Sequence, residues 1–141
     1  MAQRVVTEIR LAAVWYPVSQ WDAAKAFYGE QCGFPVDLDT TNAGLRVVQI
    51  TPPGSGCSIT IGTGITTAQP GSYEGLQLVV TDIEAARDEL RGRGVDVGPI
   101  RHFENGEWLD GKGGPWNSFA NFADPDGNGW VLQETPNRPE G

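Results

Sequence analysis

Three side chains with oxygen ligands stand at alternate positions near the C-terminus: Asp124, Asp126 and Asn128 in the stretch FADPDGNGWVLQE. A calcium-binding EF-hand loop begins with this spacing, and the glycine required at its sixth position is also present. Its twelfth position needs a bidentate glutamate, but that residue is Thr135. The flanking segments SFANFA and WVLQE are short, alternating and aromatic, as strands are, whereas helices flank an EF-hand loop. DPDGNG is therefore predicted to be a hairpin turn and not a metal site.

A second group of reactive side chains lies in the glycine-rich segment RHFENGEWLDGKGGPWNS. It includes His102, the one histidine of the chain, and histidine exchanges protons readily near neutral pH. His102 with Glu104 or Glu107 is the candidate pair for acid–base catalysis. The alternative is a solvated histidine without a catalytic role. Because the segment is polar and rich in glycine, it is predicted to be a loop over the mouth of a binding site.

Composition narrows the classes of function. A chain of 141 residues with 39% hydrophobic and 20% charged residues is typical of one soluble globular domain. The net charge of −8 argues against a nucleic-acid partner, which needs a basic surface, and is compatible with a cationic ligand. The N-terminus MAQRVVTEIR has no signal-peptide pattern and no apolar run has membrane-spanning length, so we expect a cytoplasmic protein without membrane association. Two cysteines without a CxxC spacing argue against a disulfide scaffold or a zinc ribbon.

The chain contains an internal repeat. Placing Val18 on Val80, an offset of 62 residues, aligns two amphipathic segments predicted to be helices at residues 20–31 and 82–93. Each segment opens with a predicted capping box and closes at a glycine. The predicted capping boxes are Ser19 with Asp22 and Thr81 with Glu84, and the closing glycines are Gly33 and Gly94.

The distal ends of the two units also match. PPGSGCSITIG aligns with PDGNGWVLQE when Pro52 is placed on Pro125, an offset of 73 residues, so the second unit carries an insertion of about 11 residues. The predicted order is strand, helix and three strands, written twice, which is an α+β fold. The single domain, residues 1–141, then divides into a first module at about 5–64, a linker at about 65–73 and a second module at about 74–136.

Two βαβββ units, with PVSQWDAAKAFY opening one and DPDGNGW closing the other, resemble the vicinal oxygen chelate superfamily. Its members include glyoxalase I, bleomycin-resistance proteins, fosfomycin-resistance enzymes and extradiol dioxygenases. The resemblance covers nearly the whole chain. It implies two modules related by a pseudo-twofold, with sheets that curl around a shared cleft, and it implies a homodimer.

The resemblance also implies where a metal would bind. Metal-dependent members carry a histidine on the first strand of a module and a glutamate on the fourth. The corresponding positions are Ala13 and Gly75 for the histidines, and Ser58 and Val131 for the glutamates. A catalytic divalent ion needs about three nitrogen, oxygen or sulfur ligands. We therefore predict no metal and no cofactor, which argues against a metal-dependent glyoxalase or dioxygenase.

Strand alternation predicts which side chains line the cleft, because successive residues point to opposite faces. The predicted lining is aromatic, rich in amides and uncharged, and the alternative is that these polar groups satisfy only one another or water. The predicted ligand-binding residues are Trp15, Gln49, Thr51, Ser58, Thr60, Gln77, Trp108, Asn117, Phe119, Asn121 and Gln133.

Two classes of function follow. The first is a metal-independent protein, similar to the bleomycin-resistance branch, that binds a small organic molecule in this cleft. The second is a metal-independent enzyme, such as an isomerase, a cyclase or a lyase acting on a small metabolite, with His102 as its catalytic residue. The residues favour binding and leave open whether the chain is an enzyme.

Overall fold

The order of strand, helix and strands that the sequence predicts is present twice in the fold. The computed structural model describes residues 11–136, so residues 5–10, which the predicted first module included, lie outside the described residues. The first unit consists of β1 (Ala13–Trp15), α1 (Trp21–Ala26), a π-helical segment η1 (Phe27–Gln31), β2 (Val36–Asn42), β3 (Leu45–Ile50) and β4 (Ser58–Gly62). The second consists of β5 (Leu76–Val80), α2 (Ile83–Gly92), β6 (Arg101–Glu104), β7 (Glu107–Asp110), β8 (Phe119–Ala123) and β9 (Gly129–Glu134).

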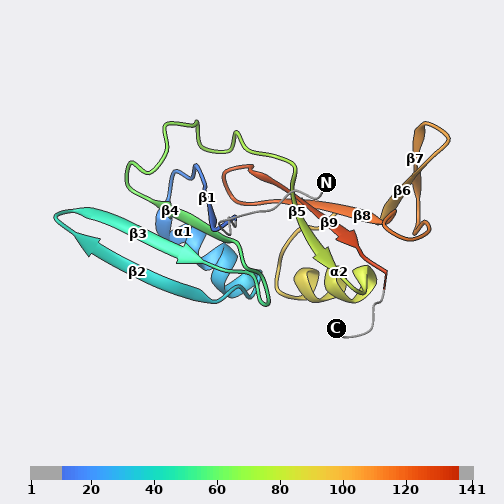
Figure 1. The fold of residues 1–141 in the computed structure, drawn as a ribbon, viewed down its shortest axis with the longest axis horizontal. Helices are drawn as coiled ribbons and strands as arrows, with labels where there is room; N and C mark the ends of the chain where they lie inside the picture. The colour runs from blue at the N-terminus through green and yellow to red at the C-terminus, as the bar shows by residue number, and fades with distance from the viewer. Residues whose placement is uncertain (1–10, 137–141) are drawn as a thin grey trace, which may run out of the picture.

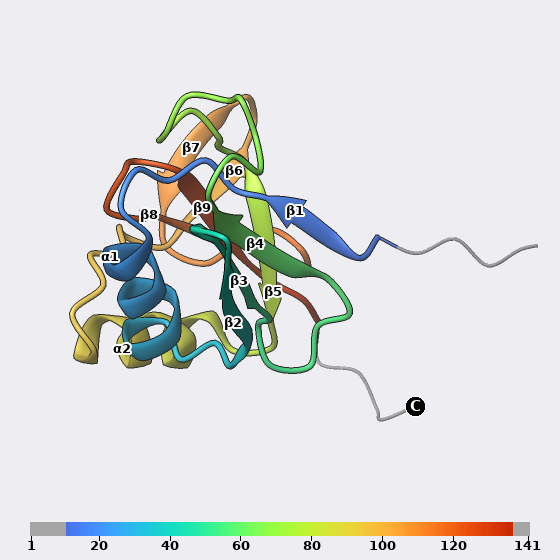
Figure 2. The ribbon, with the colours of Figure 1, turned by 90° about the vertical axis from the view of Figure 1, so that its left-hand side faces the viewer.

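Each unit forms its own mixed sheet, and neither sheet closes into a barrel. Sheet A has the strand order β1-β4-β3-β2, and sheet B has the order β5-β9-β8-β6-β7. In both sheets the first strand of the unit pairs in parallel with the last, which confirms the repeat. The two units lie side by side along the long axis (Figure 1). Figure 2 shows α1 and α2 on the same side of the molecule, so the helices leave the other side of both sheets open.

Both predicted helices are confirmed, but the predicted capping boxes are wrong. The residue before α1 is Gln20, which makes no side-chain cap, and the cap of α2 is Asp82, whose carboxylate accepts a hydrogen bond from the Ala85 backbone N–H. The helices thus begin one residue later than the predicted boxes require. Ser19 instead bonds to the Asp126 carboxylate in the second unit, through both its backbone N–H and its hydroxyl.

The insertion in the second unit is a β-hairpin and not the predicted loop. Strands β6 and β7 pair in antiparallel register and are joined at Asn105-Gly106, where both φ angles are positive, at 52° and 82°. Asn-Gly is the dipeptide that such two-residue turns favour, because both positions need the left-handed region. β6 takes the place that β2 has in sheet A, and β7 adds a fifth strand at the edge.

The DPDGNG segment is a turn between β8 and β9, as predicted, and its Asp124 and Asn128 side chains are buried in the protein. Asp124 is buried, and its carboxylate accepts hydrogen bonds from the Tyr28 hydroxyl at 2.7 Å and the Asn128 side-chain amide at 2.8 Å. Trp130 donates to the same Tyr28 hydroxyl, and Asn128 donates to the Pro17 carbonyl. We call Tyr28, Asp124, Asn128 and Trp130 the buried polar cluster. Because Tyr28 and Pro17 belong to the first unit, this cluster joins the two units.

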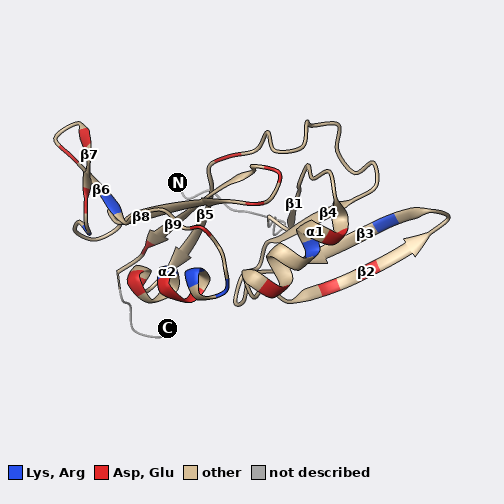
Figure 3. Ribbon diagram, turned by 180° about the vertical axis from the view of Figure 1, so that it is seen from behind, with Lys and Arg blue, Asp and Glu red and all other residues tan. Residues whose placement is uncertain are grey.

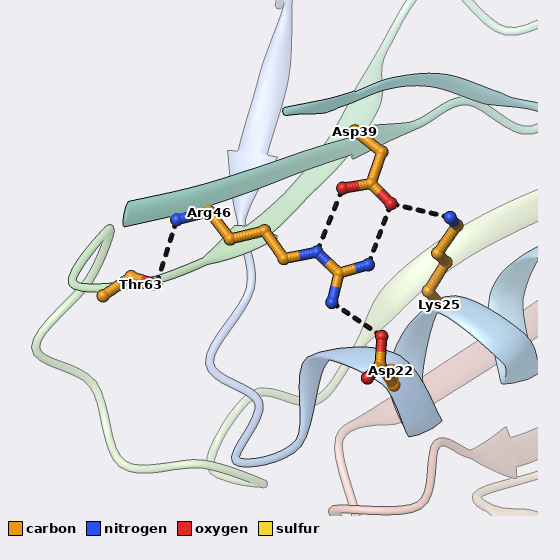
Figure 4. A network of polar contacts seen from close by, with 5 residues as sticks. All are labelled: Asp22, Lys25, Asp39, Arg46 and Thr63. Carbon is orange, nitrogen blue, oxygen red and sulfur yellow. Dashed lines mark hydrogen bonds and ion pairs between the residues drawn. The ribbon is translucent and has the colours of Figure 1, made fainter. Parts of the chain in front are cut away.

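An ion network on the surface joins α1 to the β2–β3 hairpin (Figure 4). The Arg46 guanidinium binds Asp39 through two nitrogens, at 3.0 and 2.8 Å, and Asp22 through the third, at 2.6 Å. Lys25 from α1 reaches the same Asp39 carboxylate at 2.6 Å. Hydrogen bonds from Arg46, and next from Lys25, hold the pKa of Asp39 well below its usual range.

Arg46→Met is expected to lower the melting temperature by about 1–3 °C, because an exposed ion network stabilises weakly. A lowered pKa means that the Asp39 contribution is present above the unfolded pKa of about 3.9 and declines as pH falls below it. Thermal melts should therefore show a lower melting temperature for Arg46→Met than for the wild type from neutral pH down to about pH 4. This difference in melting temperature should decrease in high salt. If Arg46→Met lowered the melting temperature equally in the wild type and in an Asp39→Asn variant, the pairing of Arg46 with Asp39 would be contradicted.

Candidate functional site

Sheet B has one covered face and one open face. On β9, Trp130 and Leu132 are buried, whereas Val131 and Gln133 between them are partly exposed. The paired strands alternate in the same way, so one face packs under α2 and the other is open. The predicted cleft residues on this open face are Gln77, Phe119, Asn121 and Gln133. Alternation in the sequence therefore identified the open face correctly.

Sheet A shows the same division. Val48, Ile50, Ile59 and Ile61 enter the core, and the residues between them point to the open side. Trp15 lies opposite Thr60, which lies opposite Gln49, so these three predicted residues form one row across the sheet. The Trp15 side chain is 57% exposed, although it lies beside the buried Thr60.

The other predicted polar residues of sheet A bond mainly to one another. Gln49 donates to the Ser58 hydroxyl at 3.3 Å, and the Thr51 and Ser58 hydroxyls are 2.6 Å apart. The Thr51 hydroxyl also donates to the Asp37 carboxylate. A similar pair is present on sheet B, where Gln77 donates to Gln133. These contacts correspond to the sequence-based alternative in which the polar groups satisfy one another, and they leave Trp15 and Leu38 as exposed apolar side chains on this face of sheet A.

The β6–β7 hairpin adds a row of aromatic side chains to the open face of sheet B. The Phe103 and Trp108 rings are 5.2 Å apart, and the Trp108 and Phe119 rings are 5.4 Å apart, both in edge-to-face contact. Phe103 and Trp108 are each 47% exposed. We call Phe103, Trp108 and Phe119 the aromatic patch. The Arg101 guanidinium lies over the Trp108 ring, with Cζ 5.2 Å from its centroid.

Two predicted site residues hold the hairpin instead of lining the open face. The Asn117 side-chain amide bonds to both the N–H and the carbonyl of Phe103. Because β8 begins only at Phe119, these two bonds take the place of strand pairing beside Phe103. His102 points to the opposite face from Arg101 and Phe103 by strand alternation. Its Nδ1 lies 2.8 Å from the Gly111 carbonyl oxygen and its Nε2 lies 3.2 Å from the Glu104 carboxylate.

The positions at which metal-dependent relatives carry ligands do not fit a metal here. Ala13 lies opposite Ser58, as the sequence alignment requires. Val131, however, lies opposite Gln77 and not opposite Gly75, which precedes β5 with φ +86°. The counterpart of Ala13 is therefore Gln77, and the predicted position Gly75 is wrong by two residues. Alanine, serine, glutamine and valine do not provide the ligands that a catalytic divalent ion needs.

No group of three or more His, Cys, Asp or Glu side chains within residues 11–136 is arranged to hold a metal ion. Among the same residues, no helix combines the length and the apolar character needed to span a membrane. Acidic residues are spread over both helices and over β2 and β7 (Figure 3). The negative charge is therefore not concentrated at one site.

A cavity of about 550 Å³ lies between the two units, away from Trp15 and the aromatic patch. Its walls are the β3–β4 connection at Pro52 and Pro53, the edge strand β5 and helix α2. Cys32 also lines it, and burial raises the pKa of this thiol to about 12. Of the predicted ligand-binding residues, the cavity wall includes Gln77.

Two open-face residues adjacent to the predicted ones were not predicted. Arg101 and Phe103 share a face with Trp108, and the signal for them was the alternation in RHFE and EWLD on either side of Asn-Gly. Val79 was also not predicted as a binding residue, although it is 53% exposed.

Solved structures with a similar fold belong to related proteins. TnmS3, an antibiotic binding protein from Streptomyces sp. CB03234, is 31% identical; the alignment covers 94% of this chain and 99% of TnmS3, with a TM-score of 0.75. A glyoxalase/bleomycin resistance protein from the same organism is 34% identical, with 89% and 100% coverage and a TM-score of 0.71. A superfamily member from Sphaerobacter thermophilus DSM 20745 is 28% identical, with 90% and 98% coverage and a TM-score of 0.71.

The search among curated proteins found no match. The family model described as the Glyoxalase/Bleomycin resistance protein/Dioxygenase superfamily matches residues 10–132, which is most of the chain. The repeat, the two mixed sheets and this match lead to one conclusion: the chain belongs to the Glyoxalase/Bleomycin resistance protein/Dioxygenase superfamily.

Proposed function

We propose that this protein binds a small organic molecule without a metal, and that the open faces of its sheets form the binding surface. The observation that carries the proposal is the exposure of aromatic side chains on rigid strands, at Trp15 and at the aromatic patch. Monomeric proteins rarely leave such side chains exposed together unless they bind something. The positions of the family's metal ligands, occupied by Ala13, Ser58, Gln77 and Val131, support binding through stacking and hydrogen bonds.

The class of ligand is proposed from similarity. TnmS3 is described as an antibiotic binding protein, and it is 31% identical over nearly the full length. We therefore propose an organic molecule of the antibiotic kind as the ligand. An isomerase, a cyclase or a lyase would need an acid–base group beside the ligand, and the His102 imidazole lies on the other face of β6. No observation here favours catalysis over binding.

We also propose that the protein is a homodimer whose cleft lies between subunits. In one chain the open face of sheet A carries the exposed Trp15 and Leu38, and the open face of sheet B carries Val79 and the aromatic patch. A second copy that covered both faces would bury this apolar surface and place the two faces opposite each other. The family resemblance also implies a homodimer.

A thermal-shift screen of aromatic antibiotics with chelator-treated protein tests the proposed function. A ligand at about 100 times its Kd is expected to stabilise the folded protein by about 2.7 kcal/mol. Elemental analysis of the same preparation should show well under one equivalent of Zn, Ni, Mn or Fe. Binding that appears only after a stoichiometric metal is restored would contradict the proposal.

Trp15→Ala is expected to weaken binding of the best ligand from this screen by about 1–3 kcal/mol, the scale of one packed aromatic contact. The measurement is isothermal titration calorimetry. Because the Trp15 side chain is mostly exposed, the variant should keep its stability in denaturant. Leu45→Ala is the control, since Leu45 is also exposed but lies at the tip of the β2–β3 hairpin. If both changes weakened ligand binding equally, Trp15 would not be part of the binding site.

A further inference from the structure

Arg101 is the basic side chain of the aromatic patch. It lies opposite Phe119 in the register of β6 and β8, and its guanidinium covers one face of the Trp108 ring. Asp110 faces it across the hairpin, yet Arg101 forms no ion pair with any carboxylate of residues 11–136. The hydrogen bonds of the same residues do not engage its side chain either. Among residues 11–136, the five N–H donors of this guanidinium therefore have no acceptor.

The Trp108 ring under Arg101 is held by its neighbours. Trp108 lies between Phe103 and Phe119 with edge-to-face contacts on both sides. Asn117 holds Phe103 through two backbone hydrogen bonds, at 3.0 and 2.9 Å. A guanidinium that lies over an indole in a cation–π contact holds its planar donors beside the ring, and such donors match the oxygens of an acidic group. The patch thus combines an apolar surface with an adjacent positive charge.

We infer that Arg101 determines ligand specificity at this patch, and that it selects a flat aromatic molecule bearing an acidic oxygen, a carboxylate or a phenolate, at the edge of its ring. The ring packs against the exposed surfaces of Phe103 and Trp108, and the oxygen accepts from the guanidinium. This inference deepens the proposed function and rests on it. An acidic ligand differs from the cationic ligand with which the net charge of −8 is compatible.

The charged groups nearest to this site are Arg101 and Asp110, which lies opposite it on the hairpin. At physiological ionic strength the field of a distant charge is screened over about 8 Å, so the acidic residues of the helices act weakly on a ligand at β6. A contact with Arg101 is not screened in this way. Figure 3 shows the basic segment on β6 at the base of the hairpin, next to β8.

The test uses three probes with one ring system: 1-naphthoate, neutral 1-naphthamide and cationic 1-naphthylmethylammonium. Titrations are followed by the NMR signal of the Trp108 indole N–H, assigned with Trp108→Phe, at neutral pH and about 0.15 M salt. The wild type is expected to bind naphthoate about 5–10 times more tightly than naphthamide and to bind the cation most weakly. Arg101→Gln should remove the preference, and Arg101→Lys should retain part of it. The control is Arg91→Gln, a change on α2 under the covered face of sheet B.

The outcomes separate this inference from the proposed function. Equal binding of naphthoate and naphthamide, or an Arg101→Gln variant with an unchanged preference, would overturn the role of Arg101 and leave the proposed function in place. A loss of preference in Arg91→Gln as large as in Arg101→Gln would also overturn it. Absence of any binding at the Trp108 signal would overturn the inference, and the ligand screen would still decide the proposed function.

Discussion

Replacing Asp124 by alanine is expected to lower the free energy of unfolding by about 3–5 kcal/mol. The Asp124 side chain is buried and accepts four hydrogen bonds: from the backbone N–H groups of Asp126 and Asn128, from the Asn128 amide and from the Tyr28 hydroxyl. Tyr28 and Asn128 are fully buried, so their donors would have no water to replace the lost carboxylate. Urea unfolding followed by tryptophan fluorescence measures the change.

Two tyrosines provide matched controls for this prediction. Tyr28→Phe removes one hydroxyl that donates to Asp124 and accepts from Trp130, and it is expected to destabilise by about 1–2 kcal/mol. Tyr16→Phe also removes a buried hydroxyl, but this one has no hydrogen-bond partner among residues 11–136. Its loss should be neutral or slightly stabilising. An Asp124→Ala effect below about 1 kcal/mol, or equal effects in the two tyrosine variants, would contradict the structural role of the buried polar cluster.

Local patterns predicted the elements of the fold because each pattern has a local physical cause. Helical periodicity and the closing glycines predicted two helical segments, which are α1 continued by η1 in the first unit and α2 in the second. Gly33 and Gly94 have positive φ, as the C-terminus of a helix favours. The predicted cap of α1 was wrong because Ser19 bonds instead to the carboxylate of Asp126, which is 107 residues away in sequence. No local pattern contains that contact.

The site was predicted less fully than the fold, for reasons of register and distance. Alternation placed Trp15 and Gln77 on open faces. The repeat, however, was aligned by matching the starts of the two helices, and this alignment does not hold for the strands before them. Trp15 is six residues before the first residue of α1, whereas Val79, its counterpart in strand pairing, is four residues before α2. This difference of two residues moved the ligand position from Gln77 to Gly75. The hydrogen bonds that occupy Gln49 and Gln133 depend on cross-strand contacts, which the sequence does not show.

Val79→Asp is expected to raise the dissociation constant of the proposed homodimer at least about 100-fold, which corresponds to about 2.7 kcal/mol. Val79 is exposed in the single chain, and the proposed dimer covers its face, so the variant would bury an unpaired carboxylate. The matched control is Leu109→Asp: Leu109 is also exposed, but lies opposite His102 on the other face of the hairpin. Sedimentation equilibrium over a concentration series measures both.

The same pair of variants decides where the ligand cleft lies. If the cleft is shared between subunits, Val79→Asp should weaken ligand binding in proportion to the loss of dimer, because each site then lacks one of its two faces. Leu109→Asp should keep both the dimer and the ligand. A wild-type protein that is monomeric at micromolar concentration would end the dimer proposal. A Val79→Asp monomer that retains full ligand affinity would assign the ligand to one chain, with the aromatic patch or Trp15 acting alone.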